Sequence, residues 1–268
     1  MDIIKRNFIH LICSGALNQY VSLEPMSVYK WKRLAYLFTQ QHLSSIALKG
    51  LKNHQFDTNI NIPFEVVKIL EDQSKNELNN LPSFPRLANP RLNKRLKRII
   101  HHEQHSIDTS IETIQILNIL IYNVNHILNF GLSLRGIIDL GHYLRTSGDK
   151  VDFVKLDRWL DQLSMKRMAQ LQGSILISVF KFDLDEIPFV HQLEENAVSL
   201  AMLSLSHLQI DSSNEWHFKQ SKTGFVRNNN AVMKKSLRRS MRYINYAPIE
   251  TISNLIFNFA KGLSEIEE

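Results

Sequence analysis

The chain contains a single cysteine, Cys13, among its 268 residues. One thiol excludes an internal disulfide framework and any zinc or iron–sulfur site built from several cysteines. Glycine and proline are also scarce, at 9 and 7 residues. Because folds with many tight turns depend on these two residues, the shortage argues against such a fold. The sequence therefore predicts a mainly α-helical, multi-helical protein.

Acidic residues are outnumbered, since 26 Asp and Glu stand against 32 Lys and Arg and leave a net charge of +6. A mild basic excess suits an anionic partner, but it also serves solubility alone. Hydrophobic residues make up 44% and charged residues 22% of the chain. That composition is typical of a globular protein with a substantial core and excludes a largely disordered one.

No hydrophobic run is both long and free of polar side chains. The longest uncharged stretch, 113–134, includes Gln115, Asn123 and His126 among its polar residues, and each is costly in hydrocarbon. The opening residues MDIIKRNFIHLICSGAL contain His10 within a short apolar run and show no clear cleavage site for a signal peptidase. We therefore expect a buried helix at 113–134, no membrane partner and a cytoplasmic location.

A cluster of prolines divides the chain. Pro82, Pro85 and Pro90 fall within nine residues, and each removes a backbone donor and restricts the residue before it. We predict an N-terminal helical unit, a Pro-rich linker and a larger C-terminal helical bundle. Their ranges are 1–81, 82–92 and 93–268.

Apolar residues recur at spacings of three and four through both halves, as in amphipathic helices. Ser27, Pro63 and Asp152 are expected at the starts of helices, the second continuing towards Leu78. The remaining helices are expected at 93–105, 111–130, 165–180 and 192–208. Residues 211–230 are expected to form a loop or a flexible hairpin.

The last helix is expected to open at Pro248 and to stop at Gly262. Its predicted apolar face carries Ile252, Leu255, Ile256 and Phe259. No alternation of period two lasts long enough to predict a sheet.

The most pointed motif is Gly173-Ser174 followed by Asp183 and Asp185. Nucleotidyltransferases hold a triphosphate with a Gly-Ser turn that opens a helix, and magnesium with two aspartates on an adjacent strand. Here Gln172–Phe180 is expected to be one continuous apolar helix, with its exit loop at 183–188. The structural interpretation is favoured, and Asp183 and Asp185 are metal ligands only in the alternative of a magnesium-dependent enzyme.

A histidine cluster, HHEQH, spans 101–105. His101 and His105 are four residues apart and share a helical face, as a zinc site requires. However, His102 occupies the place of the glutamate in a zinc-protease motif, and no third ligand is evident. A solvated basic helix face is the favoured interpretation.

Two basic clusters account for most of the positive excess. The first consists of Arg91, Lys94, Arg95, Lys97 and Arg98, and the second of Lys234, Lys235, Arg238, Arg239 and Arg242. Such rows bind phosphate on a nucleotide or a nucleic acid, although solvated helix faces look the same. Arg238, Arg239 and Arg242 are therefore candidate ligand-binding residues.

A third candidate region is SLRGIIDLGHYL. Arg135 and Asp139 are four residues apart, so they can pair on one helix. A partly buried structural ion pair is favoured over a ligand-binding role. His126, nine residues before Arg135, has the same two interpretations.

The runs IYNVNHILNFGLSLRGIIDLGHYL and LSMKRMAQLQGSILISVFKFDLDEIPF resemble the C-terminal helical part of nucleotidyltransferase-family proteins common in Bacteroidetes. The matching positions are His126, Leu134, Arg135, Asp139 and Pro188. The stretch YKWKRLAYLFTQQHLSSIALKGL is similar to the same family's N-terminal helices. Its matching positions are Trp31, Ile46, Ala47, Gly50 and Leu51, and Pro63 after the stretch also matches.

The regions that resemble the family do not include its catalytic core. Full-length members carry an α/β core with a Leu-Lys-Gly turn and an Asp-x-Asp pair for magnesium. In this chain Lys49 stands in a Leu-Lys-Gly tripeptide and Asp57 begins DTNINI, so Asn59 or Asn61 would replace the second acid. The resemblance thus implies a helical scaffold without a catalytic core and without a cofactor.

The leading hypothesis is a non-catalytic binding or regulatory module that contacts a nucleotide or a protein partner around Arg135. One alternative is a degenerate but active nucleotidyltransferase in which Lys49 and Asp57, or Asp183 and Asp185, bind magnesium. The other is a basic helical protein that binds nucleic acid.

Overall fold

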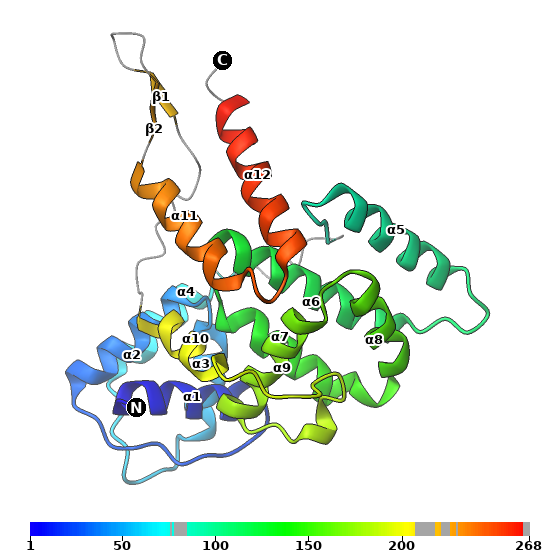
Figure 1. The fold of residues 1–268 in the computed structure, drawn as a ribbon. Helices are drawn as coiled ribbons and strands as arrows, with labels where there is room; N and C mark the ends of the chain where they lie inside the picture. Colours follow the sequence, from blue (N-terminus) through cyan, green and yellow to red (C-terminus); the bar gives the residue numbers. More distant parts are fainter. Residues whose placement is uncertain (76, 78–84, 207–217, 221–225, 229, 265–268) are drawn as a thin grey trace.

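The computed structural model describes residues 1–75, 77, 85–206, 218–220, 226–228 and 230–264 (Figure 1). These residues form twelve α-helices, two short 3₁₀ helices and one two-stranded sheet. The prediction of a mainly α-helical, multi-helical fold is confirmed.

Four helices make up the N-terminal unit: α1 Ile3–Ala16, α2 Val28–Gln40, α3 Ser44–Asn53 and α4 Phe64–Ser74. Helix α1 packs closely on α3 because both carry a glycine at the contact. A Cβ atom added to Gly15 would lie 2.2 Å from the Ile46 carbonyl oxygen, and one added to Gly50 would lie 2.5 Å from the Leu11 carbonyl oxygen. The separation of the two helices is therefore set by backbone atoms.

The rest of the chain holds eight helices. They are α5 Pro90–Gln104, α6 Ile111–Phe130, α7 Leu134–Ser147, α8 Phe153–Gln162, α9 Lys166–Phe180, α10 Ala197–Ser206, α11 Asn230–Tyr243 and α12 Pro248–Ser264. The 3₁₀ helices are η1 Gly148–Lys150 and η2 Leu184–Glu186, and the antiparallel strands are β1 Phe218–Gln220 and β2 Val226–Asn228.

Helix α6 lies at the centre of this larger part and contacts α5, α7, α8, α9, α11 and α12. Its buried leucines and isoleucines explain the uncharged stretch in the sequence. The polar residues within that stretch hold neighbouring segments: the Asn125 Nδ2 atom donates to the Arg86 carbonyl oxygen over 2.6 Å. Within the described part of the chain, no helix is both long enough and apolar enough to cross a bilayer.

The predicted helix starts at Ser27, Pro63 and Asp152 are confirmed, and that at Asp152 has a capping hydrogen bond. The Asp152 side chain accepts from the backbone N–H of Lys155 at the start of α8, which satisfies one of the first free donors of that helix. Ser27 precedes α2, although its side chain makes no capping hydrogen bond. Pro63 lies directly before α4, which ends at Ser74 rather than near Leu78. Leu78 itself lies outside the described residues.

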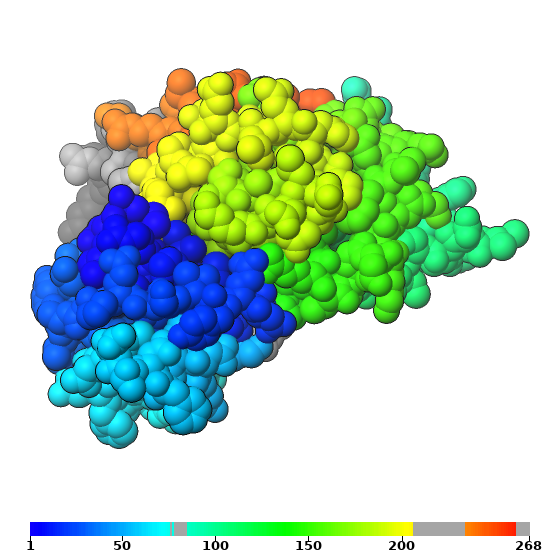
Figure 2. Space-filling view, turned by 90° about the horizontal axis from the view of Figure 1, so that it is seen from below, coloured from blue at the N-terminus to red at the C-terminus, as the bar shows by residue number. Residues whose placement is uncertain are grey.

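The two parts of the chain share one hydrophobic core, and polar contacts also join them. Gln41, which is buried, donates to the Ser204 carbonyl oxygen and accepts from the Leu134 N–H. The Arg145 Nη1 atom donates to the Leu17 carbonyl oxygen over 2.7 Å. Figure 2 shows the blue N-terminal residues packed directly against the yellow residues of the C-terminal part. The division at 1–81, 82–92 and 93–268 stays a prediction.

The C-terminal end of the predicted linker is packed rather than free. Leu87 is buried, and the backbone N–H groups of Ala88 and Asn89 donate to the Glu250 carboxylate on α12. Residues 78–84, which include Pro82, lie outside the described residues.

Helix α10 begins, and helix α12 ends, at a different residue from the one predicted. Helix α10 begins at Ala197 rather than Gln192, because the Glu194 N–H donates to the Ser174 Oγ atom on α9 instead of joining a helix. Helix α12 continues past Gly262 to Ser264, as one glycine costs a helix only about 1 kcal/mol. Strands β1 and β2 pair antiparallel within 211–230, which agrees with the expected loop or hairpin, although no sheet was predicted.

The orientation of α12 is also unexpected. Ile252, Ile256 and Phe259 from its predicted apolar face are 48%, 62% and 41% exposed, whereas Glu250 and Asn254 are buried. Helices α11 and α12 project from the same side of the molecule, with α5 beside the base of α12 (Figure 1).

Candidate ligand-binding site

The predicted binding residues on α6 and α7 lie where the two helices are joined. Helix α6 ends at Phe130, and Gly131 adopts a φ of 98° that turns the chain towards Ser133. The Ser133 side chain accepts from the Arg135 N–H and so begins α7. This short connection places His126 near the end of one helix and Arg135 in the first turn of the next.

Arg135 is held by several acceptors at once. Its Nε atom lies 3.1 Å from each Asp139 carboxylate oxygen, which confirms the predicted pair. Its Nη1 atom donates to the His42 carbonyl oxygen over 2.9 Å and lies 4.0 Å from Glu77 Oε2. Burial raises the pKa of Asp139, and the Arg135 charge opposes that rise. The guanidinium thus joins α7 to the turn between α2 and α3.

Glu77 belongs to this cluster and was missed in the sequence. Its carboxylate accepts from the backbone N–H groups of Ser44 and Ser45 and from the Ser45 hydroxyl. It therefore neutralises the positive N-terminal end of α3. Glu77 lies just before the proline cluster, and nothing in the sequence around it predicts a contact with Ser44, 33 residues away in the chain.

His126 is half-buried beside two aromatic rings. Its ring centroid lies 5.2 Å from that of Phe130 and 6.5 Å from that of Tyr122. Burial lowers its pKa, and the charges of His42 and Arg239 lower it further. The Nδ1 atom lies 3.2 Å from the Gly131 carbonyl oxygen. A carbonyl oxygen only accepts, so Nδ1 carries the proton and Nε2 of the neutral ring keeps its lone pair.

Arg239 on α11 faces this region. Burial lowers its pKa, and the neighbouring Arg242 charge lowers it too. Tyr243 beside it is buried, which raises the pKa of its hydroxyl, and it hydrogen-bonds to the Leu132 backbone and the Arg242 side chain. Among the described residues no carboxylate pairs with Arg239. A half-buried guanidinium without an acid is an electrostatically incomplete arrangement.

The structure therefore brings together part of the predicted set. His126 and Arg239 lie within electrostatic range of each other, and His42 connects them to Arg135. Arg242 adjoins Arg239 and Tyr243. Arg238 is exposed on α11, and no contact joins it to His126 among the described residues.

The residues of the magnesium alternative do not converge on a metal. Gly173 and Ser174 lie inside α9, as predicted, and are buried. Asp183 and Asp185 are exposed at η2, and the Asp183 N–H donates to Glu186 Oε2. Lys49 is exposed on α3, and Asp57 accepts from the Tyr20 hydroxyl and contacts His54 Nδ1 over 2.7 Å. Within the described ranges, no three His, Cys, Asp or Glu side chains are grouped to hold a metal ion.

The histidine cluster at the end of α5 also forms a local contact. The rings of His101 and His105 stack with centroids 4.3 Å apart. The His105 Nδ1 atom lies 2.7 Å from the His101 carbonyl oxygen, so it donates to the backbone of α5.

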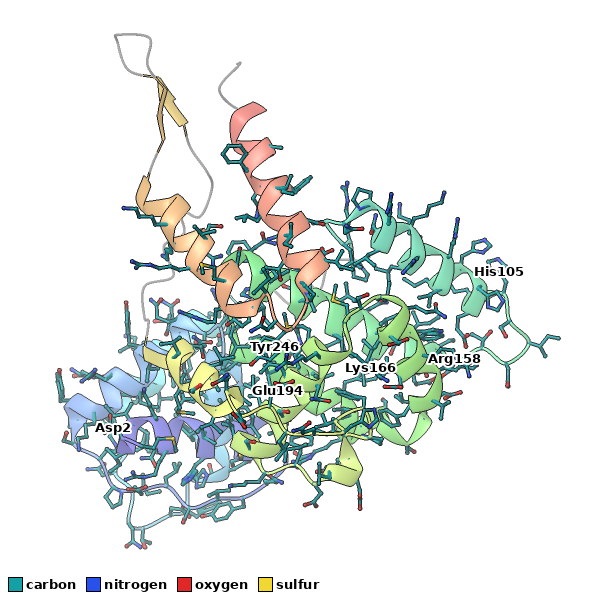
Figure 3. The ribbon with its side chains drawn as sticks, viewed as in Figure 1. Asp2, His105, Arg158, Lys166, Glu194 and Tyr246 are labelled. Atoms are coloured by element: carbon teal, nitrogen blue, oxygen red, sulfur yellow. The ribbon has the colours of Figure 1, made fainter. Side chains whose placement is uncertain are left out.

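A polar pocket of about 520 Å³ opens elsewhere, and no sequence signal indicated it. The Arg167 Nε atom lies 2.9 Å from Glu194 Oε1, and the guanidinium carbon lies 5.1 Å from the Tyr246 ring centroid. Lys166 lies 2.8 Å from Asp157. Figure 3 shows Glu194, Tyr246 and Lys166 in this part of the molecule. Both cations that line the pocket, Lys166 and Arg167, are paired with carboxylates, so it offers less to an anion than Arg239 does.

Comparison of the chain with protein-family models, with curated proteins and with solved structures finds no match.

Proposed function

We propose that the protein is a nucleotidyltransferase-related helical module that binds a nucleotide without transferring it. The observation that carries this proposal is Arg239, a half-buried guanidinium beside His126 and Arg242 without a carboxylate partner among the described residues. A phosphate group would supply the missing negative charge and accept two parallel N–H bonds from the guanidinium. The neutral His126 would add a hydrogen-bonding ring at the same place.

Arg135 supports this site by holding neighbouring segments in place. Its contacts with Asp139, His42 and Glu77 hold the turn that carries His42 against α7. We therefore assign Arg135 and Asp139 to the support of the site rather than to contact with the nucleotide.

The positions of Asp183 and Asp185 favour nucleotide binding over nucleotidyl transfer. Glu186 of η2 pairs with Arg145, which follows Arg135 by ten residues on α7. At about 1.5 Å per residue these two arginines are roughly 15 Å apart along the helix. Asp183 and Asp185 adjoin Glu186, so they lie towards the opposite end of α7 from the proposed site.

Calorimetric titration of the full chain with ATP, CTP, GTP and UTP, with and without magnesium, tests the proposal. We expect saturable binding to at least one nucleotide and a loss of about tenfold or more in Arg239→Ala, the usual effect of removing a hydrogen bond to a charged group. The matched control is Lys97→Ala, which removes one exposed positive charge from α5.

Two results would overturn the proposal. One is the absence of binding at millimolar nucleotide, and the other is an equal loss of affinity in Arg239→Ala and Lys97→Ala. Magnesium-dependent binding that disappears in Asp183→Ala/Asp185→Ala would instead support the enzyme alternative.

Nucleic-acid binding is a second candidate, favoured by the outer face of α5. Arg91, Lys94, Lys97 and Arg98 are exposed there, and none of them pairs with a carboxylate among the described residues. Retention of DNA or RNA that falls steeply with salt, and that is lost in Arg91→Ala/Lys94→Ala/Lys97→Ala/Arg98→Ala, would support it. Absent or salt-independent retention would exclude it.

A further inference from the structure

Helix α12 turns its polar side towards the protein. Glu250, Thr251 and Asn254 are 1%, 1% and 6% exposed. The Glu250 carboxylate accepts from the Ala88 and Asn89 N–H groups. The Glu250 and Asn254 side chains fix the rotation of the helix about its own axis, because turning it would leave them without partners. The buried Thr251 hydroxyl has no hydrogen-bond partner among the described residues and adds nothing to this restraint.

Further hydrogen bonds extend the same polar seam along α12. The Asn89 Nδ2 atom donates to Ser253 Oγ over 2.9 Å. Asn254 and Asn258 both donate to the Asn129 side-chain oxygen on α6, over 3.1 and 2.9 Å. The seam spans more than two turns of the helix, so the orientation of α12 does not depend on one contact.

The opposite side of α12 is apolar and open. Ile249, Ile252 and Ile256 are 44%, 48% and 62% exposed. Their spacing of three and then four residues places them in one stripe along the helix. We call these three residues the isoleucine stripe. An exposed apolar stripe on a helix held by polar contacts marks an interaction surface.

The spacing indicates what kind of surface would cover the isoleucine stripe. Positions 249, 252 and 256 follow the a–d–a pattern of a coiled-coil seam, in which each side chain fits between residues of a facing helix. Phe259, three residues after Ile256, continues this pattern and is 41% exposed, and Phe257 beside it is 50% exposed.

The charges beside the stripe indicate the chemistry of that helix. Asn89, immediately before α5, is bonded to α12, and α5 exposes Arg91, Lys94, Lys97 and Arg98. On the other side α11, which contacts α12, exposes Arg238 and Arg242. A second copy of this chain would bring the same cations to the contact, whereas an acidic helix would complement them.

We propose that α12 docks an acidic amphipathic helix of a partner protein, with the isoleucine stripe as its apolar seam. The apolar residues of the partner would cover Ile249, Ile252 and Ile256, and its flanking Asp or Glu residues would face α5 and α11. The isoleucine stripe shares no residue with the nucleotide site proposed at His126 and Arg239, and Arg242 borders both.

Fluorescence anisotropy with the full chain and a labelled peptide tests this proposal. The probe is a three-heptad helical peptide with Leu at positions a and d and Glu at e and g. A second peptide carries Lys at e and g, and a third has the acidic composition in scrambled order. We expect the acidic peptide to bind at least about tenfold more tightly than both others, and its affinity to fall as salt screens the charges.

Variants connect the binding to α12. Ile252→Ser/Ile256→Ser should weaken binding of the acidic peptide by about tenfold or more, as expected for the loss of central apolar contacts. The matched control is Val154→Ser on α8, where the valine is 73% exposed. It should leave the affinity within about twofold of the unmodified chain, since exposed substitutions away from a contact have small effects.

Three outcomes would overturn the proposal. The first is equal affinity for the acidic and basic peptides. The second is an equal loss of affinity for the acidic peptide in Ile252→Ser/Ile256→Ser and in Val154→Ser. The third is a different occupant: self-association in sedimentation equilibrium, or binding to phosphatidylcholine–phosphatidylserine vesicles, that is abolished by Ile252→Ser/Ile256→Ser.

Discussion

Asn123 on α6 lies against Gly136 on α7, and its Nδ2 atom donates to the Gly136 carbonyl oxygen over 2.9 Å. The same Nδ2 atom donates to Gln172 Oε1 on α9 over 2.9 Å. Gln172 in turn donates from Nε2 to the Leu120 carbonyl oxygen. Asn123 and Gln172 are both buried. This network joins three helices of the core and requires α6 and α7 to approach closely.

Gly136→Ala should destabilise the fold. A Cβ atom at position 136 would lie 2.0 Å from the Asn123 Oδ1 atom and 2.8 Å from its Cγ atom. Asn123 cannot move without losing its buried hydrogen bonds, so we expect the free energy of unfolding to fall by about 1–3 kcal/mol. Urea denaturation followed by circular dichroism measures the change.

Gly148→Ala is the control for that substitution. No atom lies within 4 Å of an added Cβ there, and the backbone is right-handed with φ of −62°. We expect stability to stay level or to rise by up to about 1 kcal/mol. A Gly136→Ala protein as stable as the Gly148→Ala protein would show that α6 and α7 do not pack as described.

Asp139→Asn should affect stability and leave nucleotide affinity within about twofold of the unmodified chain. The substitution removes the charge opposite Arg135, whose other contacts with His42 and Glu77 remain. The pair is partly exposed, with 28% and 33% of the two side chains accessible. Burial also raises the pKa of Asp139 and so offsets part of what its charge gains from Arg135. We therefore expect the free energy of unfolding to change by no more than about 1 kcal/mol. A large loss of nucleotide affinity with unchanged stability would place Asp139 in the binding site instead.

Glu250 should make stability depend on pH in a defined direction. Burial raises its pKa above the ordinary value of 4.5, although the Ala88 and Asn89 N–H groups oppose the rise. A carboxyl with a higher pKa in the folded chain binds more protons when folded. The contribution of Glu250 to the free energy of unfolding is therefore complete at pH values below its ordinary pKa. It is lost as the pH rises through the higher pKa that the carboxyl has in the folded chain.

Comparison with Glu250→Gln isolates this effect, because glutamine does not ionise. The unfolding free energy of the unmodified chain minus that of the variant should fall as pH rises from about 4 to about 7. Urea denaturation at several pH values measures the difference. A difference that stays constant or grows with pH would contradict the assignment.

Cys13 should be unreactive in the native protein. The thiol is 3% exposed, and burial raises its pKa to about 11. At about pH 8 the thiolate fraction is then lower than that of an ordinary cysteine by roughly 100-fold. A thiol assay with Ellman's reagent should show slow reaction in buffer and one rapid equivalent in denaturant. Rapid reaction in buffer would mean that the α1 environment opens readily.

The sequence predicts much of the helical fold because the relevant signals are local. The bounds of α6 agree with the prediction at both ends, since Ser110 and Gly131 flank one long apolar run. Asp152 identifies the start of α8 for the same reason, as a cap acts within a few residues of itself. These elements depend little on the rest of the chain.

The long-range polar contacts are not predictable in this way. The Glu77 carboxylate accepts from backbone N–H groups at the start of α3, and the Glu250 carboxylate accepts from those of the segment before α5. Each glutamate is distant in sequence from the segment that it contacts. The pattern of α12 likewise shows which of its faces is apolar, but not which face meets the protein. Here Glu250 and the asparagines decide the orientation, and Ile256 is left exposed.

The contacts of α1 have a consequence for the order of events during synthesis. The Ala16 carbonyl oxygen accepts from His142 Nδ1, and Lys5 Nζ lies 3.5 Å from the Met202 carbonyl oxygen. At about 5–20 residues per second, roughly 10–40 s separate the synthesis of α1 from that of α10. In the first part of that interval, until α7 is synthesised, α1 has only the other N-terminal helices to cover its apolar side. The Phe8–Phe38 contact between α1 and α2 and the glycine contact between α1 and α3 need only residues up to Gly50, so we expect them to be the earliest tertiary contacts formed on the ribosome.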